Sequence, residues 1–255
     1  MNNKNKPISV VILAGGSGSR FSKLNEQPKQ LSKLNNEYIL IHIINNFKKY
    51  GLKHFIFPLG FKKNFFLKFF NSKKNISKYK FNFLKKKFSI KDFKKNKLNI
   101  SLFDAGENTN KLMRILRSLN YVINNDFMVA YGDDLSNIKI NQIIKKFYKK
   151  KKTKAIVTVF KKKSQYGHVI SDKKSIVKKF IEKPFHQHPI NIGNYLFTKD
   201  LINKYSKNKH ELENDFLPIL TKKKLLMSYE HKGYFYSIND KKELIVAKKK
   251  LKKHR

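Results

Sequence analysis

The sequence predicts an α/β protein built on a doubly wound, mostly parallel sheet of the Rossmann-like kind. Short apolar runs alternate with segments that carry apolar residues at helical spacing, which is the rhythm of β-α-β units. The first apolar run, Val10–Leu13, leads directly into the glycine-rich stretch Gly15–Gly18. A short run that is apolar throughout is typical of a strand buried on both faces, so the glycines predict a tight loop at its carboxyl end.

The remaining elements follow in order along the chain. Gly51 closes the first helical pattern, because glycine directly after the last periodic residue is a C-cap signal. Strands are predicted over residues 10–13, 54–59, 98–103, 127–131 and 154–160, and helices over 39–50, 62–70, 111–123 and 139–150. Beyond Ser164 we expect shorter strands and fewer helices, which predicts an attached mixed α+β portion. The Lys- and Phe-rich segment 72–97 is weakly periodic and is expected to be an insertion or flap.

Composition limits the classes of function. The chain has 58 Lys and Arg against 17 Asp and Glu, a net charge of +41 over 255 residues. Only four of the basic residues are Arg, whereas dedicated nucleic-acid readers usually recruit Arg for bidentate contacts. Compositional drift at permissive surface positions is therefore favoured over a selected polyanion partner, and nucleic acid is not expected as a partner.

The absence of cysteine excludes disulfides, thiolate metal sites and cysteine nucleophiles. No apolar run approaches the roughly 18 residues of a membrane span, and the N-terminus has no secretory pattern. We therefore expect a cytoplasmic protein without a membrane span. The basic segment 248–255 is expected to be a solvated helix end.

The glycine-rich loop is the first candidate site. It comprises Leu13, Ala14, Gly15, Gly16, Ser17, Gly18, Ser19 and Arg20. Glycines let the backbone approach a phosphate closely with its N–H groups, Ser19 adds a hydroxyl donor, and Arg20 adds a cation with a planar fork. The spacing is neither that of a Rossmann dinucleotide loop nor that of a Walker loop. Lys29, stiffened by Pro28, follows where it could fold back onto bound phosphates.

These residues resemble the signature of the sugar-1-phosphate nucleotidyltransferases, in which Gly-Gly-x-Gly-Thr-Arg is followed by Lys-Pro-Lys-Pro. Ser19 stands here for the Thr and keeps its hydroxyl, and Gln27 and Gln30 flank Pro28-Lys29. Later motifs continue the resemblance over about residues 10–245. They are Tyr131-Gly132-Asp133, Glu182-Lys183-Pro184, Asn191-Ile192-Gly193 and Glu213-x-Asp215.

The resemblance implies a fold, a reaction and roles for named residues. The fold would be a single nucleotidyltransferase domain over 7–250, with a nucleotide-binding half over 7–150 and a sugar-phosphate-binding half over 151–250. Residues 13–20, Lys29 and Arg114 would hold a nucleoside triphosphate, while Glu182, Lys183, Asn191 and Gly193 would hold a sugar 1-phosphate. Arg20, Lys29, Asp133 and Lys183 would be catalytic, and Asp133 with Asn239 would bind Mg²⁺.

Within the family the likeness is greatest to members that transfer CMP from CTP to glucose 1-phosphate. It rests on Gly60-Phe61-Lys62, Phe103-Asp104-Ala105-Gly106 and Tyr229-Glu230-His231. Two departures from that subgroup stand out: Leu112-Met113 replaces a Gly pair before Arg114, and Asn239 replaces an Asp.

Several alternatives stay open at this point. Another base, in uridylyl, guanylyl or thymidylyl transfer, would suit the same motifs, and so would another sugar phosphate. The net charge leaves a non-catalytic, polyanion-binding protein on the same scaffold as a rival. Segment 72–97 is long enough to reach a neighbouring subunit, so a homo-oligomer is also open.

Overall fold

The computed structural model describes residues 7–16, 26–85, 88–150 and 153–252. An eight-stranded sheet forms its centre, in the order β13-β9-β12-β7-β1-β4-β6-β5. Only β12 runs antiparallel to its neighbours; every other pairing in this sheet is parallel. The sheet strands are β1 (Ser9–Leu13), β4 (His54–Leu59), β5 (Phe81–Phe83), β6 (Leu98–Asp104), β7 (Asp126–Tyr131), β9 (Ala155–Phe160), β12 (Ile190–Thr198) and β13 (Leu226–His231).

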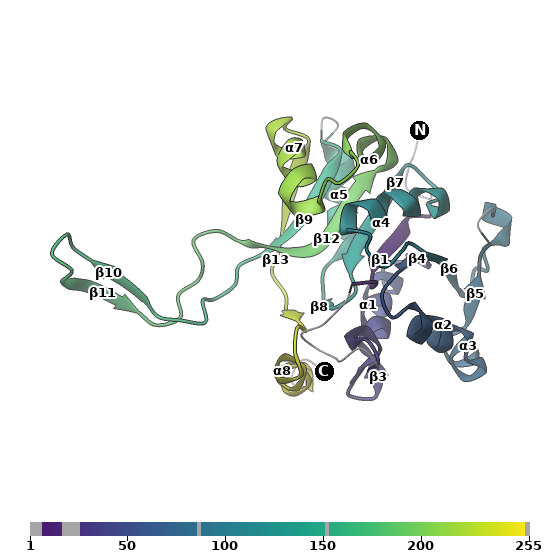
Figure 1. The fold of residues 1–255 in the computed structure, drawn as a ribbon, viewed down its shortest axis with the longest axis horizontal. Helices are drawn as coiled ribbons and strands as arrows, with labels where there is room; N and C mark the ends of the chain where they lie inside the picture. Colours follow the sequence, from purple (N-terminus) through teal and green to yellow (C-terminus); the bar gives the residue numbers. More distant parts are fainter. Residues whose placement is uncertain (1–6, 17–25, 86–87, 151–152, 253–255) are drawn as a thin grey trace.

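Helices cover both faces of this sheet (Figure 1). Val10 and Ile12 of β1 point into one apolar cluster and Val11 into the other, because successive side chains of a strand point to opposite faces. One face is covered by α1 (Ile39–Lys48), α2 (Lys63–Asn71), α5 (Ile140–Lys149) and α8 (Lys241–Lys252), and the other by α4 (Lys111–Ser118), α6 (Lys199–Tyr205), η5 (Leu212–Phe216) and α7 (Leu217–Lys222). The doubly wound, mostly parallel sheet expected from the sequence is confirmed.

Three smaller sheets complete the molecule. They are the pairs β2 (Lys33–Leu34) with β3 (Glu37–Tyr38), β8 (Asp134–Ser136) with β14 (Phe235–Ser237), and β10 (His168–Ser171) with β11 (Val177–Ile181). The β10–β11 pair forms a narrow ribbon that projects far from the body (Figure 1).

Three details of the architecture differ from the expectations. The expected shortening of the strands beyond Ser164 does not hold for β12, which with nine residues is the longest strand described and lies inside the main sheet. Segment 72–97, expected to be an insertion or flap, contains α3 (Lys73–Tyr79) and then β5, which extends the sheet beside β6. The helix expected over 111–123 ends at Ser118 and continues as a 3-10 turn, Leu119–Tyr121.

Candidate active site

A cavity of about 990 Å³ opens at the carboxyl ends of β1 and β7. The strand order reverses at β1, whose neighbours are β4 on one side and β7 on the other. Doubly wound sheets bind ligands at such a switch point, because the loops after the two strands diverge and leave a crevice. Its lining includes Leu13, Gly15, Gly16, Lys29, Lys111, Arg114, Tyr131, Asp133, Asn191, Glu213 and Asn239.

The structure brings the expected phosphate-binding lysine and the expected metal-binding carboxylate together. Lys29 opens a short 3-10 helix, η2 (Lys29–Leu31), and its Nζ forms an ion pair with Asp133. The two side chains are only 11% and 23% exposed. Asp133 follows β7 through Gly132, whose N–H donates to the Leu13 carbonyl 3.1 Å away. This bond ties the end of β7 to the end of β1.

Asn239 lies beside Asp133 through the pairing of β8 with β14. The Ile238 N–H donates to the Asp133 carbonyl at 3.1 Å, and the Asn239 amide nitrogen donates to Ser237 Oγ at 3.2 Å. Asp133 and Asn239 both line the cavity, so the amide carbonyl of Asn239 offers it a second oxygen donor besides the Asp133 carboxylate. Mg²⁺ prefers oxygen ligands and needs only one or two from the protein when phosphates and waters supply the rest. These residues therefore fit a magnesium site.

Asp134 has a different environment from its neighbour. Its side chain is buried in β8, opposite Ser237. Burial, together with the charge of Asp133, raises the pKa of the Asp134 carboxyl above its usual range. Both carboxylates line the cavity, but Asp133 is the more exposed of the two and is paired with Lys29.

In the described part of the glycine loop, Gly15 packs closely against the Arg114 side chain and the Gly60 backbone. A Cβ on Gly15 would lie 1.9 Å from an Arg114 guanidinium nitrogen, whereas a Cβ on Gly16 would meet no atom within 4 Å. Gly15 is therefore required for packing, and Gly16 leaves open space toward the cavity. Ser17, Gly18, Ser19 and Arg20, which were expected to complete the loop, lie outside the described residues.

Arg114 borders the cavity, but its side chain holds the surrounding backbone. The guanidinium is buried and donates to four carbonyls at 2.8 to 3.2 Å, those of Pro58, Gly106, Glu107 and Thr109. A guanidinium has five N–H donors, so most of its capacity is used within the chain. Through these bonds Arg114 fixes the loop after β6 against β4, and its contact with a bound nucleotide stays a prediction.

Leu112 also has a structural explanation. It is fully buried in the cluster that contains Val11, Ile56 and Ile115, beneath the sheet. Its side chain therefore fills the core and does not obstruct the nucleotide-facing loop, although the sequence places it where the family has Gly.

A second group of polar side chains in the cavity was not identified from the sequence as a unit. Tyr131 donates its hydroxyl to Glu213, which also pairs with Lys111. Burial is the main cause that raises the pKa of the Tyr131 hydroxyl, and Tyr195 and Glu213 add to it. Lys111 is the first residue of the helix that follows β6. Its place just after a parallel strand, at the carboxyl edge of the sheet, is the signal that could have identified it as a candidate site residue.

Asn191 and Gly193 are positioned at this same wall. The Asn191 amide donates to the Tyr195 hydroxyl at 2.6 Å and accepts the Gly193 N–H at 3.0 Å. Gly193 has φ of 64°, and a Cβ there would lie 2.4 Å from the Tyr131 ring. Only glycine fits this position without strain. Asn191 lines the cavity, whereas Gly193 shapes its wall from behind.

Glu182 and Lys183 are not brought to the cavity. Both side chains are 60% exposed, and Lys183 Nζ lies 3.1 Å from Glu182 Oε1. They follow β11 in the projecting ribbon and do not line the cavity. Of the four residues expected to hold the sugar phosphate, only Asn191 and Gly193 therefore lie at the cavity wall.

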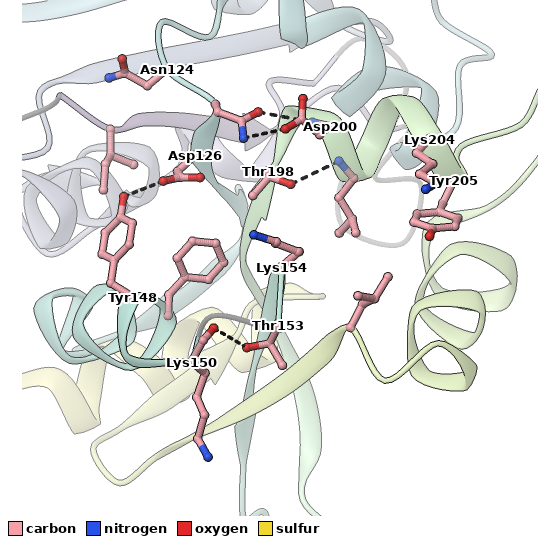
Figure 2. Close-up of a pocket in the computed structure, with 15 residues that line it drawn as sticks. Asn124, Asp126, Tyr148, Lys150, Thr153, Lys154, Thr198, Asp200, Lys204 and Tyr205 are labelled. Atoms are coloured by element: carbon pink, nitrogen blue, oxygen red, sulfur yellow. Dashed lines mark hydrogen bonds between the residues drawn. The ribbon is translucent and has the colours of Figure 1, made fainter. Parts of the chain in front are cut away.

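A second cavity, of about 720 Å³, lies at the opposite edge of the sheet (Figure 2). Its carboxylates already have partners: Asp126 accepts from the Tyr148 hydroxyl at 2.6 Å, and Asp200 accepts from the Asn125 amide at 2.9 Å. It contains none of the residues expected at the site, so the cavity at the carboxyl edge is the candidate active site.

Comparison with known proteins agrees with this geometry. The sequence pattern of the family described as "Nucleotidyl transferase" matches residues 9–253. The chain belongs to this family. It is 29% identical over 252 residues to the "Probable glucose-1-phosphate cytidylyltransferase" of Bacillus subtilis (strain 168), covering 95% of each chain. It is 28% identical over 233 residues to the "D-glycero-alpha-D-manno-heptose 1-phosphate guanylyltransferase" of Campylobacter jejuni, covering 91% of this chain and 94% of that one.

A solved structure shares the fold of this nucleotidyl transferase. The structure of UDP-glucose pyrophosphorylase complexed with UDP-glucose superposes with a TM-score of 0.71 at 20% identity, covering 98% of this chain and 100% of that one. The expected nucleotide-diphospho-sugar transferase fold and sugar-1-phosphate nucleotidyltransferase family are confirmed. In the described part of the chain, no helix combines the length and the apolar character needed to cross a membrane.

Proposed function

We propose that this nucleotidyl transferase moves CMP from CTP to glucose 1-phosphate, giving CDP-glucose and pyrophosphate. The observation that carries the reaction type is the convergence of Gly16, the Lys29–Asp133 pair and Asn239 on one cavity at the switch point of the sheet. The choice of CTP and glucose 1-phosphate rests on the similarity to the Bacillus subtilis relative over nearly the whole chain.

The reaction requires mainly that the protein position the two substrates and neutralise the charge of their phosphates. A phosphate oxygen of the sugar 1-phosphate bonds to the α-phosphorus, the bond from that phosphorus to the oxygen bridging to the β-phosphate breaks, and pyrophosphate leaves. The attacking oxygen is already anionic, so no general base is required. The repulsion between the phosphates is the obstacle that the protein must overcome.

The residues of this chain divide that work. The backbone N–H groups of the glycine loop, with Arg20 and Lys29, would bind the triphosphate, and Lys183 would bind the sugar phosphate. Asp133 and Asn239 would hold Mg²⁺, which when bound supplies positive charge at the reacting phosphate. Lys29 has a further use in this scheme, because its ion pair keeps the Asp133 carboxylate at the cavity wall.

A pyrophosphate-release screen of four nucleoside triphosphates against a panel of sugar 1-phosphates tests the proposal. We expect kcat/KM for CTP to exceed that for UTP by at least about tenfold with glucose 1-phosphate, since a backbone carbonyl facing the cytosine amino group would oppose the O4 of uracil at a cost of about 1–3 kcal/mol. Parity, or a UTP preference, would reject cytidylyl transfer and keep nucleotidyl transfer.

Guanylyl transfer is the second candidate, because the Campylobacter jejuni relative is nearly as similar, at 28% identity. The same screen decides between them. If no triphosphate releases pyrophosphate while RNA binds with a steep salt dependence, the scaffold is a polyanion binder instead.

A further inference from the structure

A smaller cavity, of about 300 Å³, lies at the amino ends of β4, β6 and β5, on the edge of the sheet opposite the candidate active site. The sequence has a lysine directly before each of these strands: Lys53, Lys97 and Lys80. The three strands are parallel neighbours, so their first residues lie along one edge, and all three lysines line the cavity. Lys48 of α1 and Lys78 of α3 also line it, which brings five amines around one small space.

The register of the sheet brings two of these lysines side by side. Phe81 of β5 pairs with Leu98 of β6, so the residues before them, Lys80 and Lys97, are opposite each other. Neighbouring strands lie about 4.8 Å apart, and like charges directly opposite each other destabilise a sheet. An anion bound between the two amines would relieve this repulsion.

The negative charge that the cavity itself provides already has partners. Glu37 is the one carboxylate among the described residues of its lining. It accepts from the Tyr79 hydroxyl and pairs with Lys78, whose Nζ lies 3.2 Å away. In the part of the chain that the structure describes, no carboxylate forms an ion pair with Lys80 or Lys97. These two amines are therefore available to a ligand.

The rest of the lining also suits a small anion. Asn45 and Asn96 are exposed at the cavity, where their amides can donate hydrogen bonds, while Ile41 and Leu98 are buried beneath it. Phosphate oxygens accept from lysine amines and amide N–H groups, and the bonds from charged donors are the stronger. A volume of about 300 Å³ is at the lower end for small-molecule sites, so the ligand must be compact.

We infer that this cavity binds a small ligand with two or more linked phosphate groups, either an inorganic polyphosphate or the phosphates of a nucleotide. Several amines with one partnered carboxylate favour a ligand of more than one negative charge. The inference goes beyond the proposed function and does not rest on it, because the linings of this cavity and of the candidate active site have no residue in common.

Titration calorimetry with inorganic pyrophosphate, in EDTA to remove divalent metal, tests the site. Lys80→Gln with Lys97→Gln removes two of its amines, and Lys146→Gln with Lys222→Gln removes the same charge from exposed positions on α5 and α7. We expect Kd to rise at least about tenfold in the first double variant, since each bond from a charged donor contributes about 1.5–3 kcal/mol, and less than about twofold in the second.

Neither pair of substitutions touches the candidate active site, so the difference between the two double variants reports this cavity. Equal losses of affinity would show that pyrophosphate responds only to the net charge of the protein, and the inference would be overturned. Unchanged affinity in the first variant would overturn it as well. Melting temperature gives a second readout, because a bound ligand stabilises the fold: pyrophosphate should raise it less in the first variant than in the second.

Two further ligands define what the site takes. Orthophosphate should bind at least about tenfold more weakly than pyrophosphate, because a single phosphate cannot reach amines on both sides of the cavity; equal affinity would overturn the requirement for linked phosphates. CDP distinguishes the two sources of the ligand. Tighter binding of CDP than of pyrophosphate, lost in the Lys80→Gln, Lys97→Gln variant, supports a nucleotide site, and tighter binding of pyrophosphate supports a site for an inorganic polyphosphate.

Discussion

Asp133 is the residue on which the proposed chemistry depends most. It lies at the end of β7, partly exposed to the cavity, and is paired with Lys29. We expect Asp133→Ala to lower kcat more than tenfold at saturating Mg²⁺, a loss of more than about 1.4 kcal/mol in transition-state stabilisation. Asp200→Ala, at an exposed carboxylate on the opposite edge of the sheet, is the control and should keep its activity. A folded Asp133→Ala enzyme with near-normal kcat would contradict the metal-binding role.

Arg114 illustrates a residue whose role depends on its partners. Removing a guanidinium that serves four carbonyls leaves buried acceptors unpaired, so we expect Arg114→Ala to reduce the free energy of unfolding by on the order of 3 kcal/mol. Arg117, which is exposed and contacts Ala105 and Thr109, is the matched control and should cost less than about 1.5 kcal/mol. Denaturant unfolding measures both. Unchanged stability with a raised KM for the triphosphate would return Arg114 to direct nucleotide binding.

At the scale of elements, His54 joins three strands and the inserted segment. It lies on β4 between Ser9 Oγ at 2.9 Å and Ser101 Oγ at 3.1 Å, and the rings of Phe88 and Phe93 pack against it. Burial lowers the pKa of His54 to about 3 in the folded protein, from an ordinary value of 6.5. The unfolded chain therefore binds a proton here between these two values while the folded protein does not.

The sign of the pH dependence follows from this difference. Stability from neutral His54 is complete above about pH 6.5 and is lost as the pH falls toward 3, at up to about 1.4 kcal/mol per pH unit. We expect His54→Gln to flatten the slope of unfolding free energy between pH 6.5 and 5, and His168→Gln, on the exposed ribbon, to leave it unchanged. Equal slopes for wild type and His54→Gln would show that His54 is protonated in the fold.

The whole molecule carries its charge unevenly, with +41 overall and a cavity that collects acidic groups. Like charges on the compact state repel one another, and the screening length falls from about 30 Å at 0.01 M salt to about 10 Å at 0.1 M. We expect the melting temperature to rise over this range of KCl. Differential scanning calorimetry measures it, and a fall in melting temperature would indicate that attractive ion pairs dominate.

The class of the fold, and several residues that line the candidate cavity, could be predicted from the sequence alone. The apolar runs and the glycines after them predicted β1, β4, β6, β7 and β9, because a buried parallel strand has a short, continuous apolar sequence. Gly15, Lys29 and Asp133 could be chosen because phosphate loops and strand-end carboxylates have local patterns. The residues that meet across the chain, such as Lys29 with Asp133, follow from the sheet order.

The interactions that each of these side chains makes depend on the tertiary structure. From the sequence alone, Arg114 is a cation available to a ligand. In the structure, its guanidinium donates hydrogen bonds to four backbone carbonyls. From the sequence alone, Leu112 would obstruct the approach of a nucleotide to the backbone. In the structure, its side chain is buried in the core. The sequence motif suggests that Lys183 belongs to the same site, yet Lys183 follows β11 and does not line the cavity. Hydrogen-bond saturation, side-chain direction and the path of a hairpin depend on residues distant in the chain, which local patterns do not encode.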